Sequence, residues 1–228
     1  MTCDAAEVTA RGFEAGTGRR GVRVGEVVTV LGGASLLTAS WVIAAADDVV
    51  PEWEAQIFRV VNDAPDVLWP IVWPPMQAGS FVGSIVVSLG ALAIARNVRL
   101  GAAALISSQV GFWAAKVIKQ IVARGRPQAL LSEVQLREEA GGLGYISGHA
   151  TVAFALAAAL APSLPRRWKL VAVAVAVTVA FGRTYAGAHL PLDVVGGAGF
   201  GLLLGTLARW AFGLGGEGLP PRPGVDPR

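Results

Sequence analysis

The sequence contains little of what soluble, disulfide-linked or thiolate-metal proteins are built from. Its one cysteine, Cys3, excludes an internal disulfide and cannot by itself form a thiolate metal site. Charged residues make up only 15% of the 228 residues, and the net charge of +3 is too small and too dispersed to indicate a nucleic-acid-binding protein. Lysine occurs three times and histidine twice, so the positions of these residues are informative.

The composition is instead typical of a membrane protein. Hydrophobic residues make up 54% of the chain and the mean hydropathy is +0.56, values outside the range of ordinary soluble domains. A helix needs about 20 apolar residues to cross a bilayer. Runs with few or no charges cover residues 27–46, 67–95, 100–123, 150–165, 170–182 and 194–208. We therefore predict an all-α integral membrane protein with six transmembrane helices; five is the alternative, because the last three runs are short.

Prolines and mixed segments interrupt this pattern. Because Pro70, Pro74 and Pro75 stand at the start of the second run, its helix is predicted to begin near Met76. Residues 52–62 combine charged and large apolar residues, which indicates a helix lying at the membrane interface. Residues 128–146 form either an interfacial element that gates lipid entry or an ordinary connector.

The distribution of charge predicts the orientation. The loops after the second and fourth runs are basic, whereas residues 47–66 carry six acids against one arginine. Since Lys and Arg gather in cytoplasmic loops, both termini are predicted to be cytoplasmic and the acidic segment extracytoplasmic, in a multi-pass protein of the plasma membrane. We expect flexible tails at 1–24 and 213–228, the latter disordered, around a membrane domain at 25–212. A cleaved twin-arginine signal at residues 19–20 is disfavoured, because the apolar run exceeds the usual core of about 7–15 residues.

Four basic residues lie on the side that this orientation makes extracytoplasmic. They are Lys119, Arg124, Arg126 and Arg183. Binding of an anion would explain basic residues placed against the topological bias. Three of them, Lys119, Arg126 and Arg183, are predicted to neutralise phosphate oxygens, and an arginine can do so with two parallel hydrogen bonds. Arg124 is expected to be solvated or to contact a lipid headgroup.

The other chemically active residues lie in two short segments. Ser147 and Gly148 open a helix, where free backbone amides favour an anion; the simpler alternative is a plain N-cap and turn. One of the two histidines, His149 and His189, could attack phosphorus while the other protonates the leaving oxygen. Asp193 could orient His189 from four residues away, or simply favour a helix N-terminus. Lys116 is expected to snorkel to the interface, or to assist a substrate diphosphate.

These segments resemble the signatures of the type 2 phosphatidic acid phosphatase superfamily. The pattern Lys-x6-Arg-Pro is matched in full at residues 119–127. Pro-Ser-Gly-His is matched at 146–149 except that Ile146 replaces proline, and Ser-Arg-x5-His-x3-Asp at 182–193 except that Gly182 replaces serine. Both departures bear on substrate preference and rate more than on the reaction.

The resemblance implies a role for each matched residue. His189 would be the nucleophile that becomes phosphorylated, Asp193 would orient it, and His149 would protonate the leaving oxygen and later activate water. The phosphoryl group would be held by Lys119, Arg126, Ser147, Gly148 and Arg183. No metal or other cofactor is expected.

The expected activity is hydrolysis of a lipid phosphate or diphosphate at an extracytoplasmic, interfacial site, with membrane lipids as the partners and no nucleic acid. Polyprenyl diphosphate, the spent carrier of cell-wall synthesis, is favoured because an outward-facing site would meet it there. Phosphatidic acid or phosphatidylglycerol phosphate is the alternative, as is a lipid phosphotransferase using the same site. The related vanadium haloperoxidases are soluble, so the apolar runs of this sequence argue against that class. A non-catalytic scaffold or transporter would not be expected to keep every part of the pattern.

Overall fold

The computed structural model describes residues 23–46 and 49–216, and all regular structure in these ranges is helical. Cys3, nearly all of the predicted N-terminal tail and residues 217–228 lie outside them. The helices are α1 (Val24–Ala44), α2 (Glu52–Asn62), α3 (Trp69–Met76), α4 (Phe81–Ala95), α5 (Val98–Val122), α6 (Pro127–Leu130), α7 (Gly148–Leu160), α8 (Arg166–Tyr185) and α9 (Pro191–Ala211), with 3-10 turns at Asp66–Leu68, Gln77–Gly79 and Ala161–Ser163. The predicted all-α class is confirmed.

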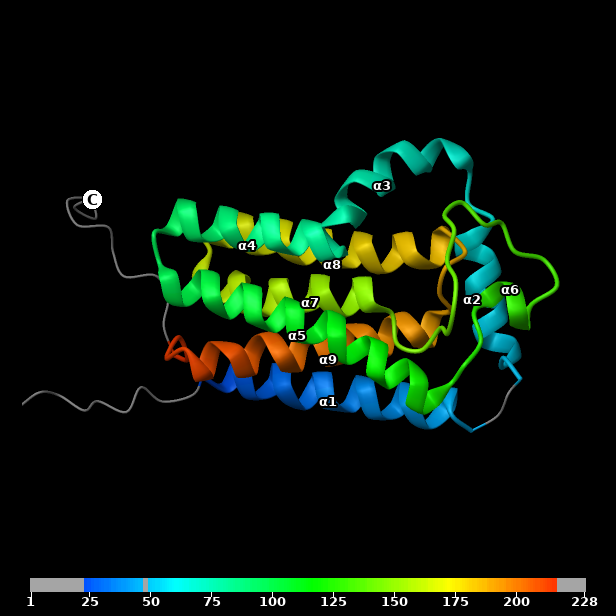
Figure 1. Cartoon of the computed structure of the whole chain (residues 1–228), viewed down its shortest axis with the longest axis horizontal. Helices are drawn as coiled ribbons and strands as arrows, with labels where there is room; N and C mark the ends of the chain where they lie inside the picture. Colours follow the sequence, from blue (N-terminus) through cyan, green and yellow to red (C-terminus); the bar gives the residue numbers. More distant parts are fainter. Residues whose placement is uncertain (1–22, 47–48, 217–228) are drawn as a thin grey trace, which may run out of the picture.

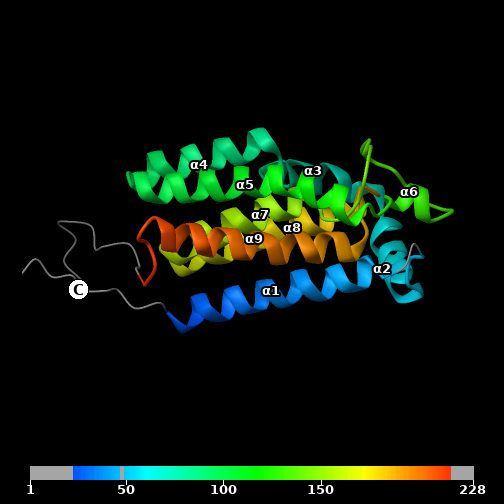
Figure 2. The same ribbon diagram turned by 60° about the horizontal axis from the view of Figure 1, so that its bottom comes forward.

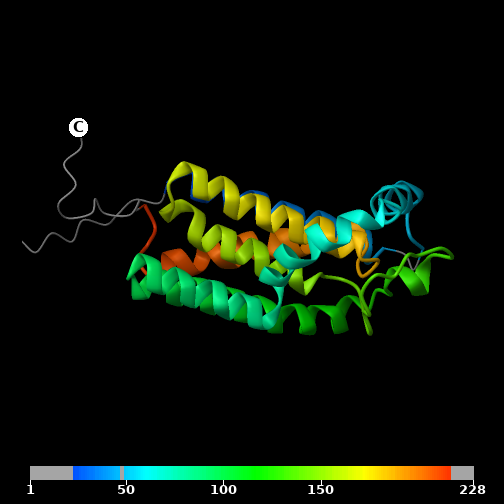
Figure 3. The ribbon, with the colours of Figure 1, turned by 90° about the horizontal axis from the view of Figure 1, so that it is seen from above.

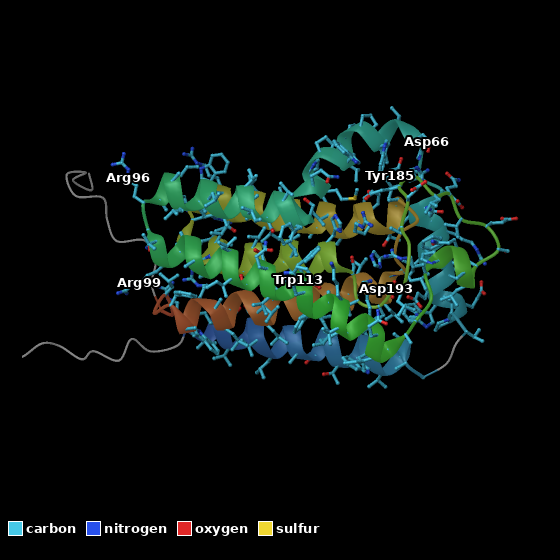
Figure 4. The ribbon with its side chains drawn as sticks, viewed as in Figure 1. Asp66, Arg96, Arg99, Trp113, Tyr185 and Asp193 are labelled. Carbon is cyan, nitrogen blue, oxygen red and sulfur yellow. The ribbon has the colours of Figure 1, made fainter. Side chains whose placement is uncertain are left out.

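The six long helices lie side by side in an elongated bundle, as Figure 1, Figure 2 and Figure 3 show from three directions. Helices α2, α3 and α6 gather at one end with the long loop before α7, whereas α1 begins and α9 finishes at the other end (Figure 1). Figure 4 shows Asp66 and Asp193 near the first end and Arg96 and Arg99 at the second. The acidic segment and the third signature therefore share an end, opposite the basic turn between α4 and α5.

Helices α7 and α9 form the centre of the bundle. They approach closely because glycines on α9 face the backbone of α7: a Cβ on Gly201 would lie 2.3 Å from the carbonyl oxygen of Thr151, and one on Gly205 would lie 2.3 Å from that of Ala155. Small residues allow such close helix packing in membrane proteins. Because α7 and α9 each begin with a signature segment, their packing brings these two segments together.

Four helices are long and apolar enough to cross a membrane: α1, α5, α8 and α9. Helices α3 and α4 together could form a fifth span, bent by 72°, and the apolar helix at Gly148–Ser163 is shorter. Only 17% of the most apolar stretch of α1 is buried inside the protein, whereas 61% of the corresponding stretch of α9 is buried. Helix α1 therefore faces outward and α9 is enclosed. The protein is an integral membrane protein; the count of six spans stays a prediction that needs α7 as the sixth.

The start of the second span differs from the prediction. Pro74 and Pro75 lie inside α3, which ends at Met76, and α4 begins only at Phe81. The break comes at Ser80, whose side chain accepts a hydrogen bond of 2.9 Å from the Gly83 amide and so caps α4. Pro70 stands near the N-terminus of α3, where an amide has no helical partner. Pro74 and Pro75 lie inside the helix, where each removes an intrahelical hydrogen bond, and α3 ends directly after them at Met76.

The loop before α7 is fastened to α2 and α8. Asn62, 1% exposed, donates to the carbonyl oxygens of Gln135 (2.9 Å) and Tyr185 (3.0 Å) and accepts from the Gln135 amide (2.8 Å). Arg137 donates to the carbonyl oxygens of Asn62 and Tyr185, each at 2.7 Å. At the other end, Leu214 is buried although it lies in the segment expected to be a tail.

Candidate active site

The three signature segments meet around one cavity of about 280 Å³ at the end of the bundle that carries the long loop. Six of the eight predicted site residues line it: Lys119, Arg126, Gly148, His149, Arg183 and His189. Ser147 and Asp193 lie behind its wall, both fully buried. A cavity of about 440 Å³ at the opposite end is lined mainly by apolar residues and contains no histidine. The predicted site residues therefore belong to the smaller of these two cavities.

Three of the four basic side chains that line this cavity, all but Lys116, come from two helix ends and one loop. Lys119, in the last turn of α5, donates to the carbonyl oxygens of Leu143 and Gly144. Arg126 follows α5 and donates to the carbonyl oxygens of Gly141 (2.8 Å) and Ala188 (2.7 Å). Carbonyl groups fix these side chains without neutralising them, so the cavity keeps positive charge for an anionic ligand.

Arg183 is the third cation, in the last turn of α8 and 4% exposed. Its Nη1 lies 3.0 Å from Glu138 Oε1, an ion pair across the cavity. Neither Nε nor Nη1 of Arg183 makes a hydrogen bond to any of the residues that the structure describes. A buried guanidinium needs hydrogen-bond acceptors, and a phosphate group would supply them.

His189 lies in the turn between α8 and α9 and is 2% exposed. Its Nδ1 is 3.3 Å from Asp193 Oδ2, and the same oxygen accepts a hydrogen bond of 3.0 Å from the Leu190 amide at the start of α9. Because Nδ1 faces the carboxylate, Nε2 is the nitrogen left for the cavity. Burial first, and then the charges of Lys119, Arg183 and Arg126, hold the pKa of His189 well below its usual value. A neutral imidazole with one fixed nitrogen is suited to nucleophilic attack.

The N-terminus of α7 forms another part of the wall. Ser147 is the N-cap, its Oγ accepting from the Ala150 amide at 3.5 Å, and its own amide donates to the Asp193 carbonyl oxygen at 2.9 Å. Gly148 and His149 follow as the first residues of α7 and line the cavity. Ser147 thus serves the capping role that the sequence left open, and its contact with phosphate stays a prediction.

Two residues of this end were missed by the sequence argument. Arg124 is neither solvated nor on the lipid surface, so that interpretation was wrong: it is 8% exposed and its Nη1 lies 3.2 Å from Asp193 Oδ1. The same guanidinium forms a forked pair with Glu54 of α2, which is fully buried. For Arg124, the sequence signal was its placement against the topological bias. Glu54 gave no such signal, because a glutamate in an interfacial helix normally faces solvent.

Fold and site together define an all-helical membrane protein in which a buried histidine–carboxylate pair faces a cluster of three cations. The chain belongs to the PAP2 superfamily, whose sequence profile matches residues 96–214. This match confirms the resemblance drawn from the signatures. Among the described residues, no group of three or more His, Cys, Asp or Glu is arranged to hold a metal ion.

Individual relatives agree with this assignment. An undecaprenyl-diphosphatase of Sulfolobus acidocaldarius is 30% identical over 103 residues, which are 45% of this chain and 50% of the relative. The match thus spans half the length of that curated relative. Among solved structures, Aquifex aeolicus LpxE superposes with a TM-score of 0.64 at 22% identity, covering 70% of this chain and 98% of that one. A transmembrane PAP2 type phosphatidylglycerolphosphate phosphatase from Bacillus subtilis gives 0.62 at 21% identity, covering 78% and 94%. At this identity the two structures show a shared fold.

Proposed function

We propose that this protein is a membrane lipid phosphatase that hydrolyses a lipid phosphate or diphosphate through a phosphohistidine at His189. The observation that carries the proposal is the pairing of His189 with Asp193 beside a cavity that holds Lys119, Arg126 and Arg183. Membership of the PAP2 superfamily supports it further. Such an arrangement provides a nucleophile, its orienting carboxylate and charge compensation for phosphoryl oxygens.

The reaction proceeds in two steps. The three cations hold the phosphoryl oxygens while His189 Nε2 attacks phosphorus, and the bond from phosphorus to the leaving oxygen breaks. A protonated His149 gives its proton to that oxygen; the dianionic phosphoryl group favours the charged imidazole. Water then attacks the phosphohistidine as His149 takes up a proton, which releases inorganic phosphate and restores His189.

Polyprenyl diphosphate is the favoured substrate. The name of the Sulfolobus acidocaldarius relative supports it. So does the outward face of α5 beside the cavity, where Trp113 and Val117 are exposed and available to contact a lipid chain. Phosphatidic acid and phosphatidylglycerol phosphate are the alternatives. We further propose that the site faces the extracytoplasmic side of the plasma membrane, because the acidic segment lies at the same end and the basic turn at the other.

The test is phosphate release by purified protein in detergent with a chelator present. Polyprenyl diphosphate, polyprenyl phosphate, phosphatidic acid and phosphatidylglycerol phosphate are compared. Both His189→Ala and His149→Ala are expected to abolish turnover while the protein stays folded. Release from one lipid in ¹⁸O-labelled water, with one labelled oxygen in the product, supports hydrolysis. Unaltered phosphate release by the His189→Ala variant would refute the mechanism. Transfer of the phosphoryl group to an added lipid alcohol, in place of phosphate release, would show that the protein is a phosphotransferase.

A further inference from the structure

Asp193 has a second polar partner besides His189. Its Oδ2 serves His189 Nδ1 and the Leu190 amide, whereas its Oδ1 lies 3.2 Å from Arg124 Nη1. The carboxylate is therefore held from both sides. Rotation of the Asp193 side chain would break the contact with Arg124 as well as that with His189.

Glu54 fixes Arg124 in turn. The two form a forked ion pair, Nη1 to Oε1 at 3.1 Å and Nη2 to Oε2. Glu54 Oε1 also accepts a hydrogen bond of 2.9 Å from the Leu192 amide in the first turn of α9. Helix α2 lies across the end of the bundle in Figure 2, and through Glu54 it is joined to the helix that carries Asp193.

Charge makes the arrangement dependent on every member. Glu54 and Asp193 are two fully buried carboxylates that share one guanidinium. Removing Arg124 would leave both without a cation, and removing the Glu54 charge would leave Arg124 to Asp193 alone. Breaking one partner of a buried ion pair is strongly unfavourable, because the remaining charge stays buried and uncompensated. Neither Glu54 nor Arg124 lines the cavity, so neither is placed to touch the phosphoryl group.

We propose that Glu54 and Arg124 are positioning residues that act through Asp193 to keep His189 in one tautomer and one orientation. The effect of this positioning role on kinetics rests on the proposed function, whereas its effect on the His189 tautomer does not. A neutral imidazole next to a fixed carboxylate carries its proton on Nδ1, which leaves Nε2 free to attack. Loss of Glu54 or Arg124 would let the Asp193 carboxylate rotate. The His189 imidazole could then exchange between its two tautomers.

The first measurement is ¹⁵N NMR of imidazole-labelled protein. The chain contains two histidines, so a His149→Gln background leaves His189 as the only imidazole. One tautomer, protonated on Nδ1, is expected in this background. Adding Glu54→Gln or Arg124→Gln is expected to give two tautomers or the reversed one. An unchanged single tautomer in both double variants overturns the proposal, whatever the protein's activity.

The second measurement is kinetic, with His149 restored. Glu54→Gln and Arg124→Gln are expected to lower kcat about 10- to 100-fold, by analogy with outer-shell residues that orient a metal-bound histidine. KM should change by less than about threefold because the cations of the cavity are intact. Arg124→Lys, which keeps the charge but loses the fork, should recover part of kcat. A wild-type protein without phosphatase activity would refute the proposed function and leave the NMR result to decide this one.

Glu26→Gln is the matched control. Glu26 is 7% exposed, pairs with the buried Arg209 (3.8 Å), and lies at the opposite end of the bundle. The substitution removes the charge of a buried glutamate without touching the site. A merely structural role for Glu54 predicts that both variants lower Tm and that neither alters the tautomer. Equal effects of both variants on kcat at a temperature where both are folded would contradict the proposal.

Discussion

The carboxylate of Glu138 lies 3.0 Å from the guanidinium of Arg183, across the cavity that holds both histidines. The Glu138 side chain is 31% exposed and the Arg183 side chain 5%. The loop that carries Glu138 is fastened to α2 and α8 by Asn62 and Arg137. Glu138 is thus paired with Arg183, one of the cations that the proposed mechanism assigns to phosphate binding. In that mechanism the phosphate of the substrate must displace the Glu138 carboxylate.

Glu138→Gln is therefore expected to strengthen anion binding. Removing the competing charge should lower the inhibition constant for orthovanadate or inorganic phosphate by up to about fivefold, since a partly exposed ion pair contributes about 0.2–1 kcal/mol. The value of kcat should change little. Glu139→Gln is the control, because Glu139 lines the same cavity and makes no ion pair among the described residues. Weaker inhibition in the Glu138 variant would show that its carboxylate assists binding.

Lys116 provides a test of the substrate class. It is exposed, lines the same cavity one helical turn before Lys119, and its Nζ lies 4.6 Å and 4.4 Å from the ring centroids of Phe112 and Trp113. Such contacts hold an ammonium group in place, here where a second phosphate could reach it. Lys116→Gln is expected to lower kcat/KM for polyprenyl diphosphate about tenfold, the equivalent of one charge-assisted contact, and that for polyprenyl phosphate less than threefold.

The control for this comparison is Lys169→Gln, since Lys169 lines the cavity at the opposite end. Equal losses on both lipids in the Lys116 variant would assign the side chain to general attraction of anions. No loss on either would leave only the snorkelling role.

Asn62 should be important for stability because it fastens the long loop. It is 1% exposed and makes three hydrogen bonds to the backbone of the loop and of α8. Asn62→Ala removes the hydrogen bonds of the Gln135 N–H and C=O groups, whereas the Tyr185 carbonyl keeps Arg137. It is therefore expected to destabilise the protein by about 1–3 kcal/mol and to expose residues 131–143 to protease. Thermal unfolding in detergent and limited proteolysis measure both effects. Gln56→Ala, an exposed change on the same helix, should alter neither; equal loop cleavage in both variants would contradict the prediction.

The site was more predictable from sequence than the structure around it. Lys119, Arg126, His149, Arg183 and His189 could be assigned together because their spacing within short segments is kept in the fold. Glu54 could not, because it meets Arg124 across 70 positions of sequence and no local spacing records that contact. The start of the second span was mispredicted for a different reason: two prolines lie inside α3 although proline is unfavourable in a helix interior, and α3 is accordingly only 8 residues long.

Substitution of glycine by alanine should have opposite effects at the contact between α7 and α9 and on the open face of α4. A Cβ at Gly201 would lie 2.3 Å from the Thr151 carbonyl oxygen, whereas one at Gly90 in α4 would meet nothing within 4 Å. Gly201→Ala should force the two central helices apart and destabilise the protein by about 1–3 kcal/mol, the usual effect of overpacking. Gly90→Ala should stabilise it by up to about 1 kcal/mol, because alanine loses less backbone entropy in a helix.

Thermal unfolding of both variants in the same detergent measures the difference. Because α9 carries Asp193 and α7 carries His149, the Gly201 variant should also lose activity at temperatures where it is still folded, while the Gly90 variant keeps it. A Gly201 variant as stable and active as wild type would mean that the two helices can separate without moving the site. The close approach of α7 and α9 would then not be what sets the distance between His149 and the His189–Asp193 pair.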